Sequence, residues 1–438
     1  MQTQNKRFPL LVIGILLLCI LALILYNVPP VHDRLAWRVD ALRARIKYAF
    51  SPPEQAVFVP QTQETITPPV SPAASSYNAT ETPTPIQTST ATPPPVNPAN
   101  SPTPTFTPTL TPTPIPAEAR LDGFRHEYQR WNNCGPANLA IALSYWGWDG
   151  TQQDTAVFLK PNDRDKNVMP YEMANYVEEQ TGLRAMIREG GDLETIKALI
   201  AAGFPVIVEK GFEGAGFDDW MGHYEVVSGY EGASERFFAQ DTYKGPDLPV
   251  PYDEFINQWR AFNYLYLVIY PPEQETKLQS VLGLQFYENF NQRYAEQKAR
   301  QETSSLEGRD LFFALFNQGT NQVNLRDYTA AATAYDAAFA NYPLLPAQER
   351  PWRMLWYQTG PYFAYYYTGR YQDVIDLATT TLGAMSEPIL EESYYWRAKA
   401  YLAAGDNEAA IQDLRQCLKV HPDFNPCVDE LGLLGIEP

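Results

Sequence analysis

The segment from Pro52 to Pro116 most constrains what this chain can fold into, because no part of it can form a packed core. It holds 18 of the chain's 38 prolines, repeats the dipeptide Thr-Pro, and contains no Lys or Arg. Proline removes backbone hydrogen-bond donors, and the few large apolar side chains cannot offset the entropy lost on ordering. We therefore predict a disordered Pro/Thr linker over residues 51–117, with separate folded domains after it.

An uncharged run of large apolar side chains occupies residues 10–26, shortly after two basic residues. Extended to Val28, the run is close to the roughly 20 residues that cross a bilayer as a helix. A cleaved signal peptide is the alternative, but no small-residue cleavage site follows the run. We predict an uncleaved N-terminal transmembrane anchor over residues 1–30.

Residues 31–50 show helical apolar spacing with arginines between the apolar positions, which are Val31, Leu35, Val39, Leu42 and Ile46. This pattern predicts a juxtamembrane amphipathic helix on the lipid surface. The positive charges after the anchor favour a cytoplasmic body by the positive-inside rule. The linker favours an extracytoplasmic body instead. At about 3.1 Å per residue it would span roughly 200 Å, enough to hold a domain clear of the membrane. The alternative is that the linker is only a passive hinge. We predict a single-pass cell-membrane protein with extracytoplasmic folded domains.

The charge of the chain is unevenly distributed. The first fifty residues carry seven Lys or Arg against two Asp, a net charge of +5, so the remainder carries −23 and the whole chain −18. Nucleic-acid binding requires clustered positive charge, so an acidic body of this kind excludes nucleic acid as a partner.

Four cysteines are too few for a disulfide scaffold, and they lack the spacing of a metal site: Cys19, Cys134, Cys417 and Cys427. We expect neither a metal nor a cofactor. Cys417 and Cys427 flank one step from helix to helix. They are predicted either to form a disulfide, which would indicate an oxidising compartment, or to be two reduced core thiols.

Residues 118–272 mix helical and strand patterns. Helical spacing and capping residues predict helices over 134–146, 171–180 and 193–202. Runs rich in β-branched and aromatic residues predict strands over 183–188, 205–210, 224–230, 236–240 and 264–270. Because the helices come first and a mostly antiparallel sheet follows, we predict an α+β domain.

Cys134 opens the first of these helical patterns and is followed directly by Gly135-Pro136. Proline is tolerated in the first turn of a helix, so this sequence suits a helix start. The positive end of the helix dipole and a nearby imidazolium both favour a thiolate, and in such settings thiol pKa values fall to roughly 3.5–7.5. Cys134 is therefore a candidate nucleophile, with a small buried core residue as the alternative.

His223 and Asp241 open and close two strand-like runs that are separated by the turn signal Glu231-Gly-Ala-Ser. If the hairpin is centred on Gly232, His223 faces Asp241 on one side of the sheet, because each lies nine residues from that centre. A carboxylate in that place fixes the tautomer of the ring and stabilises the imidazolium. The pattern therefore predicts a nucleophile, a base and an orienting acid in one site.

A family resemblance rests on two motifs, Cys134-Gly-Pro and Gly222-His-Tyr-Glu-Val-Val-Ser-Gly-Tyr. A glutamine, Gln129, precedes them and an aspartate, Asp241, follows them. They resemble the papain-like peptidases that process bacteriocin leaders, the double-glycine peptidases, and their stand-alone C39-like relatives. The resemblance covers about residues 121–272. Those peptidases are fused to a transporter with a nucleotide-binding domain, whereas this chain has no phosphate-binding Gly-rich loop. Substrate identity therefore does not carry over.

The resemblance implies a papain-like cysteine peptidase domain. It implies Cys134 as the nucleophile, His223 as the general base and Asp241 as the acid that orients the ring. Gln129, with the Cys134 backbone N–H, would form the oxyanion hole. The expected substrate is a peptide or a protein.

Residues 281–438 have a helical pattern throughout, with an internal repeat. Three stretches resemble tetratricopeptide repeats, which place small and aromatic residues on one helix and alanines on the next: 327–339, 369–378 and 398–410. The turn position moves from Arg326 to Gly369 to Gly405, steps of 43 and 36 residues against about 34 in this class. We predict an all-α tetratricopeptide-like repeat domain that binds a protein partner.

Taken together, the patterns predict a membrane-anchored extracytoplasmic cysteine peptidase that hydrolyses peptide bonds and uses helical repeats for protein binding. Two alternatives stay open at this point. One is a non-catalytic peptide-binding module on a stalk. The other is an acyl transferase, since an amine can intercept the same thioester. The expected partners are a peptide or protein substrate, a protein on the repeats, and the membrane at the N-terminal helix.

Overall fold

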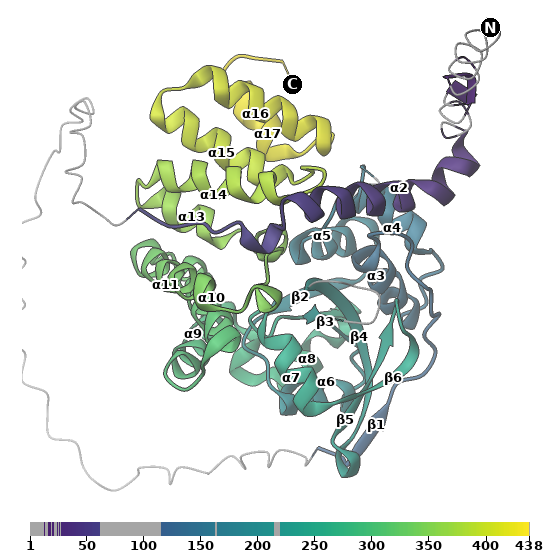
Figure 1. Ribbon diagram of the computed structural model, residues 1–438. Coiled ribbons are helices and arrows are strands. Elements are labelled where there is room, and N and C mark those ends of the chain that lie inside the picture. The colour runs from purple at the N-terminus through teal and green to yellow at the C-terminus, as the bar shows by residue number, and fades with distance from the viewer. Residues whose placement is uncertain are drawn as a thin grey trace, which may run out of the picture. The chain divides into compact units, whose positions relative to one another are not determined.

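The computed structural model describes residues 28–61, 115–162, 164–213 and 220–437, with scattered residues between 13 and 26 (Figure 1). The described residues up to 60 and from 115 onward belong to one compact unit. Within it lie a sheet domain, residues 115–286, and a helical repeat domain, residues 288–437. The predicted disordered linker lies outside the described residues from 62 to 114.

One antiparallel sheet organises the sheet domain. In the described residues it has seven strands, in the order β2-β7-β3-β4-β5-β6, with β1 paired to β4. The strands are β1 Glu118–Arg120, β2 Arg184–Arg188, β3 Val206–Phe212, β4 Met221–Glu231, β5 Arg236–Asp241, β6 Gly245–Pro251 and β7 Tyr266–Tyr270. Five of them confirm predicted strands. The central strands β3 and β7 are buried on both sides, which explains the apolar run through β7 and the apolar start of β3, Val206 to Val208.

Helices cover both faces of this sheet (Figure 1). One face packs against α3 Cys134–Tyr145, α4 Gln152–Leu159 and α5 Pro170–Gln180. The other packs against α6 Leu193–Ala201, α7 Tyr252–Arg260 and α8 Glu275–Leu282. Short 3-10 turns complete the described elements: η1 Pro53–Gln55, η2 Gly232–Ser234, η3 Pro272–Gln274, η4 Gly283–Phe286, η5 Tyr342–Leu344 and η6 Ala347–Glu349.

Strand β4 shows how alternation places side chains on each face. Tyr224 and Val226 face the core beneath α3, and Val227 faces the opposite core. A bulge between Val227 and Gly229 inserts one residue, so Tyr230 also faces the opposite core. Without the bulge, Tyr230 would lie on the same side as Tyr224.

Several elements differ from the sequence predictions. The sequence patterns missed α4, α7, α8, β1 and β6, and the helices do not simply precede the sheet, because α6 and α7 lie between strands in the chain. The start of α4 had a local signal, since Thr151 and Asp154 form a capping box. Strand β6 contains three prolines and lies at the sheet edge, where a missing backbone N–H breaks no ladder.

A helix, α2 Pro29–Phe50, precedes the linker, and its last turns pack against the repeat domain. The Lys47 ammonium donates to the Gly383 carbonyl at 2.7 Å, and the rings of Tyr48 and Trp352 meet edge to face. Away from these contacts the helix leaves large apolar side chains exposed: Val39, Leu42, Ile46 and Phe50.

The predicted start of the disordered linker is wrong. Residues 51–61 run along the repeat domain, and Phe58 is buried there against Phe339 and Tyr365. Arg350 also donates to the Glu54 carbonyl at 2.9 Å. One phenylalanine and a short 3-10 turn are enough to bind this segment to an existing apolar surface, which a composition argument over the whole linker does not detect.

None of the helices among the described residues is long and apolar enough to cross a membrane. The predicted transmembrane anchor lies largely outside the described residues, since only 13, 16–18, 20, 21, 24 and 26 of the run 10–26 are described.

The repeat domain consists of paired helices. Its helices are α9 Glu288–Thr303, α10 Gly308–Asn324, α11 Tyr328–Asn341, α12 Met354–Tyr357, α13 Gly360–Tyr367, α14 Tyr371–Ala384, α15 Glu391–Ala404, α16 Asn407–Val420 and α17 Asn425–Leu433. The turns within the three pairs place Arg326, Gly369 and Gly405 in the same left-handed conformation, with φ of 62°, 76° and 84°. Arg326 thus occupies the glycine position of its repeat. Cys417 and Cys427 form a disulfide.

An insertion explains the long step between the first two repeats. Residues 342–359, which contain η5, η6 and α12, lie between α11 and α13. This insertion contacts the sheet domain: the Arg353 guanidinium donates to the Trp220 carbonyl at 2.8 Å, and the Gln358 amide donates to the Ala261 carbonyl at 2.6 Å. The irregular spacing therefore reflects a segment that joins the two domains.

Candidate active site

Cys134 is the first residue of α3, as predicted, and its side chain is half-buried. The nine residues that follow it, Gly135 to Leu143, are all buried, so the helix is fixed against the sheet along its length. The thiol therefore sits at the positive end of a helix that cannot easily shift.

His223 lies near the start of β4 and Asp241 ends β5, so two adjacent strands bring them together. The His223 Nε2 atom is 3.3 Å from the Asp241 Oδ1 atom, and both side chains are buried. That oxygen also accepts from the backbone N–H groups of Tyr243 and Lys244, each at 2.8 Å. The carboxylate is thus held in one orientation toward the ring, and the Cys134 thiol is close enough to His223 to affect its pKa.

The strand register that sequence analysis proposed for this hairpin is wrong. A centre at Gly232 would pair Val226 with Phe238, whereas the structure pairs Val226 with Gln240. The 3-10 turn and the bulge shift the pairing by two residues at that point. Because a shift of two preserves the side-chain face, Asp241 still reaches His223 as a diagonal neighbour.

The pKa values of Cys134 and Asp241 both depend on their interaction with His223. Burial disfavours the imidazolium, but hydrogen bonds to Asp241 and Cys134 outweigh it and raise the pKa of His223 to about 9. Burial also disfavours the Asp241 carboxylate, yet the hydrogen bond and charge of His223 hold its pKa well below its ordinary value. For Cys134, burial opposes ionisation, and the bond to His223 overcomes it, so the pKa of the thiol is lowered. These directions favour a thiolate–imidazolium pair.

Gln129 is connected to the site through Thr242. The Gln129 backbone N–H donates to the Thr242 carbonyl at 2.9 Å, and the Thr242 hydroxyl donates to the Gln129 Oε1 atom at 2.8 Å. Once Oε1 is used in this way, the NH₂ group of the amide is the end that is left to donate elsewhere.

Asn138 is a residue of this site that sequence analysis missed. Its Nδ2 atom lies 3.0 Å from the Cys134 carbonyl, 2.7 Å from the Tyr224 carbonyl and 3.2 Å from the Thr242 hydroxyl. One buried amide therefore links the cysteine helix, the histidine strand and the end of β5. The signal was present, because Asn138 is a polar side chain within an otherwise apolar stretch of α3.

Gly222, the residue before His223, is closely surrounded by aromatic side chains. A Cβ atom at Gly222 would lie 2.8 Å from the rings of Phe262 and Tyr357. The Tyr357 hydroxyl also hydrogen-bonds to the Gly222 backbone. Tyr357 belongs to α12, so a side chain of the repeat domain supports the strand that carries His223. No local sequence pattern signals this contact, because it joins two domains.

Comparison with known proteins identifies the folded parts of the chain. Residues 115–267 match the Peptidase_C39 like family, and residues 313–344 and 391–424 match tetratricopeptide repeats. The sheet domain is a C39-like domain. The three matches agree with the resemblance found in the sequence, including the repeat class of the C-terminal helices. No curated protein matches the chain.

Two solved structures are similar to the C39-like domain. One is a double glycine motif protease from an AMS/PCAT transporter in complex with the leader peptide, at 23% identity and a TM-score of 0.28, over 35% of this chain and 94% of that chain. The other is a C39-like peptidase from Bacillus anthracis, at 17% identity and a TM-score of 0.29, over 35% of this chain and 96% of that chain.

Proposed function

We propose that the protein is a cysteine peptidase that hydrolyses peptide bonds with Cys134, His223 and Asp241. The observation that carries the proposal is that the His223 ring lies 3.3 Å from a fixed carboxylate and interacts with the Cys134 thiol, whose pKa it lowers. In this arrangement the Cys134 thiolate attacks the peptide carbonyl, and the thiol proton resides on His223. Asp241 holds the ring and stabilises its positive charge.

The remaining steps complete the proposed reaction. Attack forms a tetrahedral intermediate whose oxyanion is stabilised by the Cys134 backbone N–H at the start of α3 and by the NH₂ group of Gln129. His223 then gives its proton to the leaving amine, which leaves a thioester on Cys134. Water hydrolyses the thioester, with His223 as the base, and regenerates the thiolate.

We further propose that the chain is a single-pass membrane protein with its C39-like domain outside the cytoplasm, and that the repeats bind a protein substrate or partner. The uncharged run over residues 10–26 supports an anchor. The disulfide between Cys417 and Cys427 supports an oxidising compartment.

The test uses full-length protein and two variants, Cys134→Ala and Cys19→Ala. The Cys19 variant is the matched control, because it removes a thiol that lies in the apolar N-terminal run. Wild type and Cys19→Ala should cleave members of a fluorogenic peptide library, and Cys134→Ala should be slower by about a thousandfold or more, since removal of a nucleophile abolishes the unit that performs catalysis.

Covalent labelling gives a second readout. In the Cys19→Ala background, an iodoacetamide probe should label Cys134, and the rate should reach its plateau well below pH 8 because the thiol is already ionised. Equal cleavage by wild type and Cys134→Ala, or a labelling rate that rises only near pH 9, would show that Cys134 is not an activated nucleophile.

A further inference from the structure

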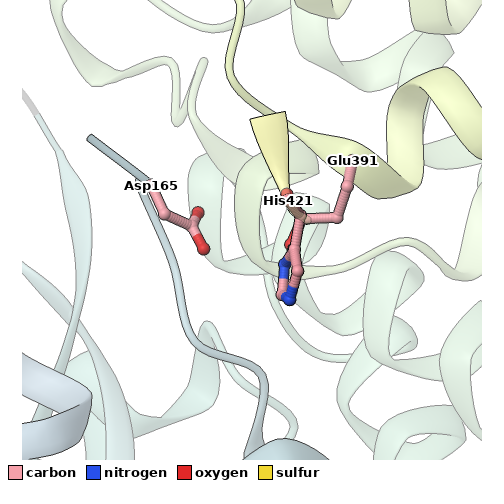
Figure 2. A group of neighbouring side chains, drawn as sticks. All are labelled: Asp165, Glu391 and His421. Carbon is pink, nitrogen blue, oxygen red and sulfur yellow. The ribbon is translucent and has the colours of Figure 1, made fainter. Parts of the chain in front are cut away.

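Three side chains with metal-binding atoms meet where the C39-like domain contacts the last helical repeat (Figure 2). Asp165 lies in the segment between α4 and α5, Glu391 is the first residue of α15, and His421 directly follows α16. One ligand atom from each residue lies within 4.8 Å of the other two. Figure 2 shows the Asp165 carboxylate directed toward His421 and Glu391 from the opposite side.

The two carboxylates are buried, His421 is half-buried, and one carboxylate oxygen has no partner among the described residues. Asp165 and Glu391 are each only 3% exposed. The His421 Nδ1 atom is 2.8 Å from the Glu391 Oε1 atom, whereas the Glu391 Oε2 atom is buried and has no hydrogen-bond partner among the described residues. Buried carboxylates in proteins are normally hydrogen-bonded, ion-paired or bound to a metal. A buried carboxylate oxygen of this kind, beside two other ligand groups, is a position in which a cation would be stabilised.

The charge around the three residues has the same implication. Four carboxyl groups lie close enough to repel one another: Asp165, Glu172, Glu391 and Glu392. Lys160 and His421 are positive groups that face them. The Lys160 ammonium is also hydrogen-bonded to the Asn132 carbonyl at 2.7 Å. A bound divalent cation would reduce the repulsion among the four carboxyl groups.

The positions of the ligands are set by contacts outside the cluster. The disulfide between Cys417 and Cys427 spans the turn that carries His421. The Asn162 amide donates to the Val420 carbonyl at 2.8 Å, which fixes the start of the Asp165 segment against the same turn. The three ligands are therefore brought together before any ion binds, which reduces the entropic cost of binding.

We propose that Asp165, Glu391 and His421 bind one divalent transition-metal ion of the Zn²⁺ type, which joins the C39-like domain to the last repeat. Two carboxylate oxygens and an imidazole nitrogen are ligands that Zn²⁺ takes, and a water completes a four-coordinate site. The nitrogen ligand disfavours Ca²⁺ and Mg²⁺, which prefer oxygen. His421 coordinates through Nδ1 and carries its proton on Nε2, so its hydrogen bond to Glu391 is replaced by the two bonds to the ion.

Cysteine spacing gave no indication of this site, because none of its ligands is a cysteine and they come from two domains. The ion would tie the last repeat to a segment that begins at Lys160. Since Lys160 bonds to the carbonyl two residues before Cys134, the ion would also hold the turn that precedes the catalytic helix. The proposal does not depend on the peptidase activity.

The experiment uses full-length protein that carries Cys19→Ala and Cys134→Ala, so that no free thiol competes for the ion. After treatment with a chelator and dialysis, Zn²⁺ is titrated in competition with a chromophoric chelator. We expect one bound equivalent. Asp165→Asn and His421→Ala should each weaken binding at least tenfold, since even partners of metal ligands contribute about 10–100-fold.

The matched control is Asp423→Asn. It removes a nearby negative charge that is exposed and does not belong to the three ligands. Its affinity for Zn²⁺ should stay within about twofold of the background protein. An equal loss in Asp423→Asn and Asp165→Asn would reveal general electrostatic attraction rather than coordination, and absence of a bound equivalent in the background protein would also overturn the proposal.

X-ray absorption at the zinc edge keeps the proposal testable if a ligand variant fails to fold. In the zinc-loaded background protein we expect a shell of nitrogen and oxygen at roughly 2.0–2.2 Å, with imidazole scattering beyond it. A sulfur shell, or a shell without imidazole, would place the ion elsewhere.

Discussion

His223 is the residue on which the candidate active site depends most. Its ring interacts with the Asp241 carboxylate and with the Cys134 thiol. Each of these interactions favours the charged imidazolium against the cost of burial. Asp241 is in turn held by two backbone N–H groups, so its negative charge persists in a buried place. The activity of the site should therefore follow the ionisation of this pair rather than that of an isolated cysteine.

The pH profile tests this coupling. As pH rises, kcat/KM should increase when the thiol ionises, below the ordinary cysteine value near 8.5, and decrease above about 9, where His223 loses its proton. Asp241→Asn keeps an acceptor for the ring but removes the charge. It should lower kcat/KM by about tenfold and move the alkaline limb to lower pH, because each pKa unit corresponds to about 1.4 kcal/mol.

The measurement is kcat/KM on one library peptide between pH 5 and 10. Lys244→Gln serves as a control, because Lys244 contacts Asp241 through its backbone N–H and not its side chain. An alkaline limb at the same pH in wild type and Asp241→Asn would contradict the assigned role of the carboxylate.

At the scale of elements, the turns within the three helix pairs share one backbone conformation but differ in residue type. Gly369 and Gly405 occupy the left-handed conformation without steric cost, and Arg326 occupies it with a side chain present. The residue type at this position is therefore a weaker signal than its geometry. This explains why the first repeat departs from the usual glycine but still forms a helix pair.

Substitution of Gly405 measures the cost of that conformation. A Cβ atom at Gly405 meets nothing within 4 Å, so Gly405→Ala should lose only backbone energy, about 1 kcal/mol of the free energy of unfolding. Gly432 is the matched position, since its Cβ would also meet nothing within 4 Å but it lies inside α17 with ordinary φ. Gly432→Ala should gain about 0.5–1 kcal/mol. Urea unfolding followed by circular dichroism checks both, and equal effects would refute the explanation.

On the scale of the whole molecule, the repeat domain is part of the support of the candidate active site. The insertion around α12 reaches the start of β4, where Tyr357 contacts Gly222 and Arg353 contacts Trp220. The rings of Trp220, Phe262 and Tyr357 pack together at this contact, with centroids 5.7–6.1 Å apart. The strand that presents His223 is therefore braced by a domain that carries no catalytic group.

Loss of this support should reduce activity. Tyr357→Ala removes a buried ring and the hydroxyl partner of Gly222, so the start of β4 should become less ordered and kcat/KM should fall by about tenfold, since small displacements of catalytic groups have large effects. Tyr367→Ala is the control, because Tyr367 is a repeat-domain tyrosine that is 55% exposed. The kcat/KM of the Tyr367→Ala variant should be unchanged. If both variants are fully active, the two domains do not cooperate in catalysis.

Local features of the sequence were sufficient to predict most of the individual helices and strands. Apolar periodicity and caps located α3, α5 and α6 and five strands, because those signals lie within a few residues of each other. They also identified Cys134 as a helix start and His223 and Asp241 as the ends of two paired runs. The prolines of β6 and the short helix α4 were missed, because an edge strand and a two-turn helix are stabilised mainly by neighbours.

Contacts between distant segments were beyond the reach of such signals. The register of the β4–β5 hairpin depends on a bulge, the three links made by Asn138 depend on how α3 lies on the sheet, and the support from Tyr357 depends on the docking of two domains. The cluster of Asp165, Glu391 and His421 arises in the same way, from residues far apart along the chain. Residue type and spacing report local backbone preference, whereas such sites are created by burial of surfaces against one another, a property of the folded chain alone.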